Sequence, residues 1–157
     1  MPTDTIVYMH GSLDLMHPGW IDRLREAKAH GDFLYVGVWD DDMLRYYRGE
    51  DYPIQPLQER ILEVLACKYV DEVIIGAPYI LTKDLITTLN IHKVVGFVTD
   101  DDKPLPQHQQ LDQYVEAKNL QIYKEIPAKD NDLTLEMIAH RIFLQRKAYL
   151  DKFAKKN

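Results

Sequence analysis

The sequence contains one cysteine, Cys67, and has neither a signal peptide nor a long apolar run. A single cysteine cannot form an internal disulfide, and the apolar helical pattern around it (ILEVLACKYV) favours a place in the core. No apolar run approaches the roughly 18 residues of a membrane span. The N-terminal residues MPTDT also lack the pattern of a signal peptide. We therefore expect a cytoplasmic protein without a membrane span.

The chain also has no excess of basic residues, because its formal net charge is -6. This charge argues against a broad surface for nucleic acid or for an anionic membrane. Tyr46 and Tyr47 lie between Arg45 and Arg48, but one short cluster in an acidic chain does not make a nucleic-acid platform. A ligand that carries phosphate would have to be bound by a local pocket.

Length and composition favour one ordered domain. The 157 residues can bury a single core, and a second full domain would not fit. Short β-branched or aromatic runs alternate with segments of helical period, which is typical of βαβ units and a parallel sheet. We expect strands at about 5–9, 33–38, 71–75, 93–98 and 120–124.

Helices are expected between these strands. The first carries Trp20, Leu24 and Ala27 at helical spacing, and others are predicted around 57–65, from Thr82, and within 107–118. The last should begin near Asp132 and run past Tyr149, with its apolar stripe docked on the core: Leu135, Ile138, Ile142, Tyr149 and Phe153. The segments 45–56 and 99–107 are predicted as loops, where ligands usually bind.

The stretch GSLDLMHPGW, residues 11–20, follows the first predicted strand. Ligands of open α/β sheets bind beyond the carboxyl ends of strands, and a helix N-terminus favours an anion. His17 would add a donor, and Gly19 would leave space for a phosphate. A helix-capping Asp14 and a packed His17 explain the same residues about equally well without any ligand.

This stretch resembles the nucleotidyltransferase signature of the cytidylyltransferases, with Gly11, Asp14, His17 and Gly19 in matching places. The segments 45–86 and 133–142 resemble more narrowly the C-terminal domain of the ethanolamine-phosphate cytidylyltransferases. The resemblance implies a Rossmann-like nucleotidyltransferase fold with helices on both faces of a parallel sheet. It also implies a single cytidylyltransferase-like domain over residues 1–157, in the place of the C-terminal half of a two-domain protein.

The resemblance further implies an enzyme that converts CTP and phosphoethanolamine to CDP-ethanolamine and pyrophosphate in phosphatidylethanolamine synthesis. Mg2+ would arrive with CTP, with no tightly bound cofactor and no metal site of the chain's own. A second cytidylyltransferase domain or a second copy of the chain is the expected partner.

The same resemblance assigns roles to individual residues. His17 would contact the phosphates of CTP, and Asp14 would order the signature loop. Arg48 stands where the family carries a phosphate-binding lysine, and Arg60 matches an arginine that faces the site. The solvated face of a helix is the other interpretation of Arg60. Thr134 matches part of the closing serine/threonine motif.

Three departures from the family pattern are informative. Trp20 replaces the second histidine of the signature, Gly96 and Phe97 replace a His-Gly pair after the fourth strand, and AKDN (128–131) replaces the opening of the last motif. Lys129 could partly supply the lost cation. Loss of one such donor typically lowers a rate by about 10² to 10³. We therefore predict that this domain alone is slow or inactive.

Other polar clusters are weaker candidates. The triplets at 40–42 and 100–102 are more typical of solvated loops and N-caps than of a metal site. The remaining histidines have no zinc-like spacing, and only His10 is expected near the site. Two further hypotheses stay open: a non-catalytic module that binds nucleotide or a partner domain, and a nucleotidyltransferase with another acceptor, such as phosphocholine or glycerol phosphate.

Overall fold

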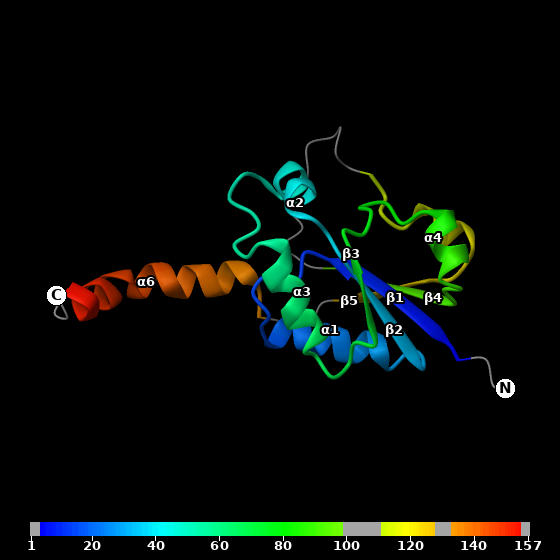
Figure 1. Ribbon diagram of the computed structural model, residues 1–157, viewed down its shortest axis with the longest axis horizontal. Helices are drawn as coiled ribbons and strands as arrows, with labels where there is room; N and C mark the ends of the chain where they lie inside the picture. The colour runs from blue at the N-terminus through cyan, green and yellow to red at the C-terminus, as the bar shows by residue number, and fades with distance from the viewer. Residues whose placement is uncertain (1–3, 99–110, 128–132, 155–157) are drawn as a thin grey trace.

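A five-stranded parallel sheet forms the centre of the computed structural model, which describes residues 4–98, 111–127 and 133–154 (Figure 1). The strands are β1 (Ile6–Gly11), β2 (Phe33–Val38), β3 (Glu72–Ile75), β4 (Lys93–Val98) and β5 (Tyr123–Pro127). Their order in space is β3-β2-β1-β4-β5, and every neighbouring pair is parallel. The predicted α/β fold with a parallel sheet is therefore confirmed.

Helices cover both faces of the sheet (Figure 1). α1 (Pro18–Lys28) and α3 (Leu57–Leu65) pack on one face, against the side chains of Val7 and Met9 of β1. α4 (Lys83–Thr88) and α5 (Val115–Asn119) cover the other face, towards which Tyr8 points. Successive side chains of a strand point to opposite faces, so the apolar run of β1 contributes to both cores.

The order of the strands determines where a ligand can bind. From β1 the chain continues to β2 and β3 on one side, and it then returns to place β4 on the other side of β1. This reversal leaves a crevice beyond the carboxyl ends of β1 and β4, which is the usual ligand position in open α/β sheets. The predicted signature stretch begins at the end of β1.

Some predicted boundaries were wrong. The fifth strand lies three residues later than expected, at Tyr123–Pro127. Of the predicted helix over 107–118, the described residues from 111 onward are helical only from Val115, where α5 (Val115–Asn119) begins. Residues 41–48, part of which we predicted as loop, form α2 (Asp41–Arg48). The side chain of Asp40 caps α2 by accepting a hydrogen bond of 2.7 Å from the backbone N–H of Met43.

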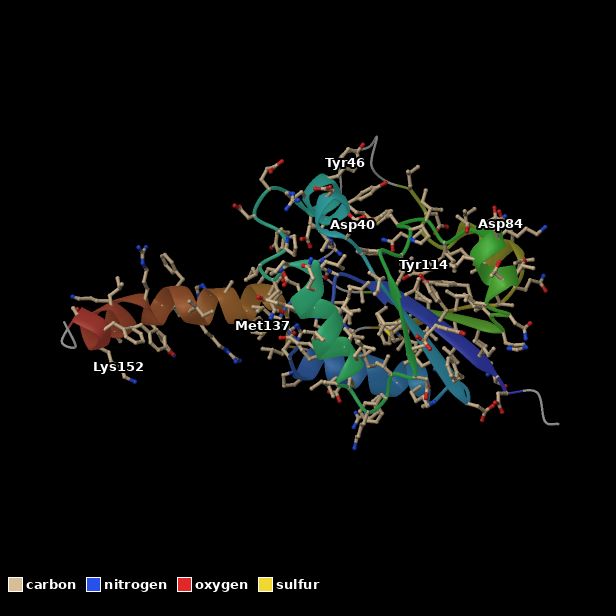
Figure 2. All side chains as sticks on the ribbon, in the orientation of Figure 1. Asp40, Tyr46, Asp84, Tyr114, Met137 and Lys152 are labelled. Carbon is tan, nitrogen blue, oxygen red and sulfur yellow. The ribbon has the colours of Figure 1, made fainter. Side chains whose placement is uncertain are left out.

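The last helix, α6 (Leu135–Ala154), contradicts the prediction of a docked apolar stripe. It projects away from the sheet, with Met137 beside the domain and Lys152 far out along the helix (Figure 2). None of its side chains is buried, and Ile142 and Phe153 of the predicted stripe are 55% and 61% exposed. An amphipathic pattern predicts an apolar face but not the surface that covers it. In the described part of the chain, no helix is both long and apolar enough to span a membrane.

Candidate active site

The loop after β1 adopts an unusual backbone conformation. Leu13 and Leu15 have φ angles of 50° and 47°, in the left-handed region that residues with a side chain rarely adopt. This backbone conformation raises the free energy of the folded state by about 1 kcal/mol or more per residue, and it persists only where the surrounding structure fixes it. Leu13 is fully buried, so packing contributes to holding the loop.

Asp14, between these two leucines, attaches the loop to a distant segment. Its carboxylate is 1% exposed and accepts hydrogen bonds from the backbone N–H groups of Ile54 (2.7 Å) and Gln55 (2.9 Å). The Gln55 side chain in turn accepts a bond of 2.8 Å from the N–H of Leu15. The helix-capping interpretation of Asp14 is wrong, because the residue at the N-cap of α1 is His17.

Arg60 is the fully buried cation of the site. Its guanidinium donates to the carbonyl oxygens of Ser12 (2.7 Å), Trp39 (2.8 Å) and Gln55 (3.0 Å), and to the Asp41 carboxylate (2.7 Å). The solvated interpretation of Arg60 is therefore wrong, since the residue is 0% exposed. Four donated bonds explain how the charge is tolerated in the interior, and they join the loops that follow β1 and β2.

His17 stands at the N-terminus of α1, with Pro18 in the first turn. The residue is 6% exposed, and its Nδ1 atom is buried without a hydrogen-bond partner among the described residues. Burial and then the charge of Arg23 lower the pKa of His17, whereas the charge of Glu136 raises it. Because both lowering effects disfavour the imidazolium, the ring is a neutral donor or acceptor near neutral pH.

Trp20 packs over the end of β1. A Cβ atom added at Gly11 would lie 3.1 Å from the Cη2 atom of Trp20, so the indole covers this glycine. The rings of His17 and Trp20 have centroids 6.2 Å apart. The guanidinium carbon of Arg23 lies over the Trp20 ring, 5.1 Å from its centroid. The predicted signature residues are thus gathered at one place, with an indole where the resemblance predicts an imidazole.

The start of α6 reaches the same place. A Cβ at Gly19 would lie 2.1 Å from the carbonyl oxygen of Leu133, so glycine is needed for this close approach. The Tyr52 hydroxyl donates a bond of 3.1 Å to the Glu136 carboxylate. Thr134 caps α6, because its Oγ1 accepts a bond of 3.2 Å from the Met137 N–H. The first turn of α6 therefore covers the N-terminus of α1.

Two predicted residues remain, Arg48 and Gly96. Arg48 is the exposed last residue of α2, and its charge opposes the rise in the pKa of Tyr52 that burial and Glu136 cause. Gly96 is buried in β4, where a Cβ would meet the Tyr123 hydroxyl at 2.5 Å. Residues 128–131 with Lys129, and the triplet at 100–102, lie outside the described residues.

His10 lies one residue before the signature, in a buried aromatic cluster. Its ring centroid is 5.1 Å from both Trp39 and Tyr114, and its Nε2 lies 3.0 Å from the side-chain oxygen of Gln113. Burial lowers the pKa of His10 from 6.5 to about 4, although the hydrogen bond with Gln113 opposes this shift. His10 is therefore uncharged at neutral pH.

Sequence reasoning missed several residues that build the site. Gln55 lies in the predicted loop and Glu63 in the predicted helix, and both hold the signature loop in place. The Gln55 side chain donates a hydrogen bond of 2.8 Å to the Glu63 carboxylate, which also accepts one of 3.1 Å from the Met16 N–H. No local pattern indicates the contacts of Gln55 with Leu15 and of Glu63 with Met16, which span 40 and 47 residues. Arg23 could have been found, because it lies three residues after Trp20 on a predicted helix.

Comparison with known proteins identifies the family. The profile of the family described as "Cytidylyltransferase-like" matches residues 8–150. An ethanolamine-phosphate cytidylyltransferase from Dictyostelium discoideum is 43% identical over 99% of the chain, and one from Arabidopsis thaliana is 40% identical over 99%. The chain spans only 42% and 36% of these two relatives.

A solved structure supports the fold. The lipopolysaccharide core biosynthesis protein from Thermoplasma volcanium GSS1 superposes with a TM-score of 0.61, over 83% of this chain and 100% of the other, at 23% identity. At this identity the likeness concerns the fold alone, and it agrees with the predicted Rossmann-like sheet. The profile match extends over most of the described sheet and helices. The chain therefore belongs to the cytidylyltransferase-like family.

Proposed function

We propose that the protein to which this chain belongs transfers the cytidylyl group of CTP to phosphoethanolamine, giving CDP-ethanolamine and pyrophosphate. The observation that carries the proposal is the match to relatives of that name over 99% of the chain, at 43% and 40% identity. The site supports it, because a helix N-terminus and a buried imidazole suit a phosphate ligand. The single cysteine favours the cytosol as the place of this reaction.

In this reaction a phosphate oxygen of phosphoethanolamine attacks the α-phosphorus of CTP. A new P–O bond forms as the bond to the pyrophosphate leaving group breaks. His17 would donate a hydrogen bond to a phosphate oxygen. Asp14 and Arg60 would hold the loop in place through the bonds described above. Arg48 would bind phosphate at the end of α2, as a planar fork rather than a point charge.

Mg2+ is proposed as the cation that accompanies CTP. In the part of the chain that the structure describes, no three His, Cys, Asp or Glu side chains gather into a cation site. The triphosphate and water would therefore supply most of the oxygen ligands, as is common for Mg2+. The ion would neutralise phosphate charge in the reaction.

We further propose that this domain turns over slowly. Trp20 covers Gly11, and its indole cannot place an imidazole on a phosphate. Restoring the family residue with Trp20→His should raise the rate, up to the about 10² to 10³ that one such donor contributes. The matched control is Trp39→His, a change of the same type in the aromatic cluster around His10. An unchanged rate in Trp20→His would contradict the idea that this residue limits turnover.

The direct assay measures pyrophosphate released from CTP with phosphoethanolamine or phosphocholine as acceptor. Slow release that depends on phosphoethanolamine supports the proposal. Faster release with phosphocholine or glycerol phosphate would assign another acceptor. A rate normal for the family would contradict slow turnover by this domain.

A non-catalytic binding module is the second candidate, and the position of Trp20 over Gly11 favours it. Calorimetry distinguishes the two functions. Binding of CTP or CDP-ethanolamine with no pyrophosphate release, also in Trp20→His, would support the module.

We also propose that the chain works beside a second cytidylyltransferase domain, either in a longer protein or in a second copy. The matched relatives are more than twice as long as the matched stretch, and α6 exposes large apolar side chains such as Phe143, which is 70% exposed. Sedimentation equilibrium of the chain tests the second-copy arrangement. A mass of one chain at all concentrations would contradict it.

A further inference from the structure

Negatively polarised oxygen atoms lie over the proposed phosphate site, at the start of α6. The Leu133 carbonyl oxygen and the Nδ1 atom of His17 both approach the place that a Cβ of Gly19 would occupy, to 2.1 Å and 3.0 Å. The Glu136 carboxylate in the first turn of α6 is close enough to His17 for its charge to raise the pKa of that ring. A carbonyl and a carboxylate therefore lie beside the imidazole that a phosphate would contact.

A hydrogen bond between distant segments holds the first turn of α6 in this position. The Tyr52 hydroxyl donates a bond of 3.1 Å to the Glu136 carboxylate, across 84 residues of chain. The segment after Tyr52 is itself fixed to the signature loop, because the Ile54 N–H donates to the Asp14 carboxylate. The outer turns of α6 have no buried side chain, so packing there does not oppose a movement of the helix. The Tyr52–Glu136 bond can therefore break while the sheet and α1 stay intact.

A phosphate chain and the Glu136 carboxylate oppose each other at this place. The N-terminus of α1 attracts an anion, whereas a carboxylate beside it repels one. Glu136 is exposed, so water and salt screen its charge and the repulsion changes an affinity by a modest factor. Release of the Tyr52–Glu136 bond would let the first turn of α6 withdraw with its carboxylate. Molecules with a broken bond would then bind the anion with full affinity, and the intact bond lowers the affinity measured for all molecules together.

We propose that the bond between Tyr52 and Glu136 is an autoinhibitory latch, which holds the first turn of α6 over the phosphate site. The ligand that must release it is the phosphate chain of a nucleotide, bound at His17 and the N-terminus of α1. This inference rests on the proposed function for the nucleotide, although not for the recognition of phosphate itself.

The test is calorimetry of the full chain with two probes, inorganic pyrophosphate and CTP. Tyr52→Phe removes the bond and keeps the carboxylate, whereas Glu136→Gln removes the charge and keeps an oxygen that can accept the bond. The matched control is Asp151→Asn, because Asp151 is an exposed acid of the same helix, in its outermost part, and its loss changes the net charge equally. Circular dichroism confirms that each variant is folded.

We expect Tyr52→Phe and Glu136→Gln to bind both probes about threefold to tenfold more tightly than the wild type, and Asp151→Asn to stay within about twofold. Unchanged or weaker binding in Tyr52→Phe would overturn the latch, even if Glu136→Gln binds more tightly. Absence of binding by the wild type and by both variants would overturn the latch and the proposed nucleotide site together. Tighter binding of pyrophosphate in both variants, without binding of CTP, would support the latch and reject the proposed function.

Discussion

The buried His10 should make the stability of this protein depend on pH. Its neutral ring satisfies both polar neighbours: Nε2 lies 3.0 Å from the Gln113 oxygen, and Nδ1 lies 3.3 Å from the Tyr8 hydroxyl. Protonation would place a charge among Trp39 and Tyr114, whose rings exclude water. The substitution His10→Gln removes the titration and keeps a donor that can bond to Gln113.

The size of the effect follows from the two pKa values. His10 titrates near 6.5 in the unfolded chain and at about 4 in the folded protein. Between these values the unfolded state binds more protons, so the free energy of unfolding falls as the pH falls. Relative to pH 7.5, the loss is about 2 kcal/mol at pH 5, and it levels off near 3 kcal/mol below pH 4.

The assay is urea unfolding followed by circular dichroism at pH 7.5, 6 and 5. His17 and His30, whose pKa values are also lowered, contribute with the same sign, so the measured quantity is the difference between wild type and variant. Between pH 7.5 and 5, the free energy of unfolding of His10→Gln should fall by about 2 kcal/mol less than that of the wild type. The control is His140→Gln on the exposed α6. Equal losses in wild type and His10→Gln would refute the reasoning.

Three further substitutions test the site. Arg60→Met should lower the free energy of unfolding by about 3–5 kcal/mol, because the half-buried Asp41 carboxylate and three carbonyl groups lose their donor. A loss below about 1 kcal/mol in urea would contradict this role. Gly19→Ala should lower the free energy of unfolding by about 1–3 kcal/mol, since the added Cβ would meet the Leu133 carbonyl at 2.1 Å. An unchanged thermal midpoint would show that the chain before α6 does not pack against Gly19. Glu136→Gln should lower the pKa of His17 further, measured by NMR titration, because the carboxylate charge raises it, whereas an unmoved or raised pKa would show that this charge does not act on the ring.

The parts of the fold that depend on local pattern were predictable from the sequence. The strands at 33–38 and 93–98 have the predicted bounds, because buried parallel strands appear as continuous apolar runs. The start of α1 was also predictable, since Pro18 stands in its first turn. α2 was missed because Leu44 is its only buried residue, so little apolar periodicity marks it.

The contacts that hold the site together were not predictable from spacing. Asp14 meets Ile54 and Gln55, and Arg60 meets Ser12, across 40 to 48 residues of chain. Such pairs depend on how the loops after β1 and β2 come together in three dimensions. The family resemblance indicated that Asp14, His17 and Arg60 belong to the site. Only the structure shows that the buried Arg60 joins the loops after β1 and β2 through hydrogen bonds.

The position of α6 has a mechanical consequence. Its 20 residues form a rod about 30 Å long, with Leu133 and Glu136 at the inner end against Gly19 and Tyr52. The outer turns have no side chain in the core to hold them. Such a rod acts as a lever whose short arm rests on the N-terminus of α1. A contact that tilts the outer turns of α6 would therefore displace the Leu133 carbonyl and the Glu136 carboxylate, which lie beside His17.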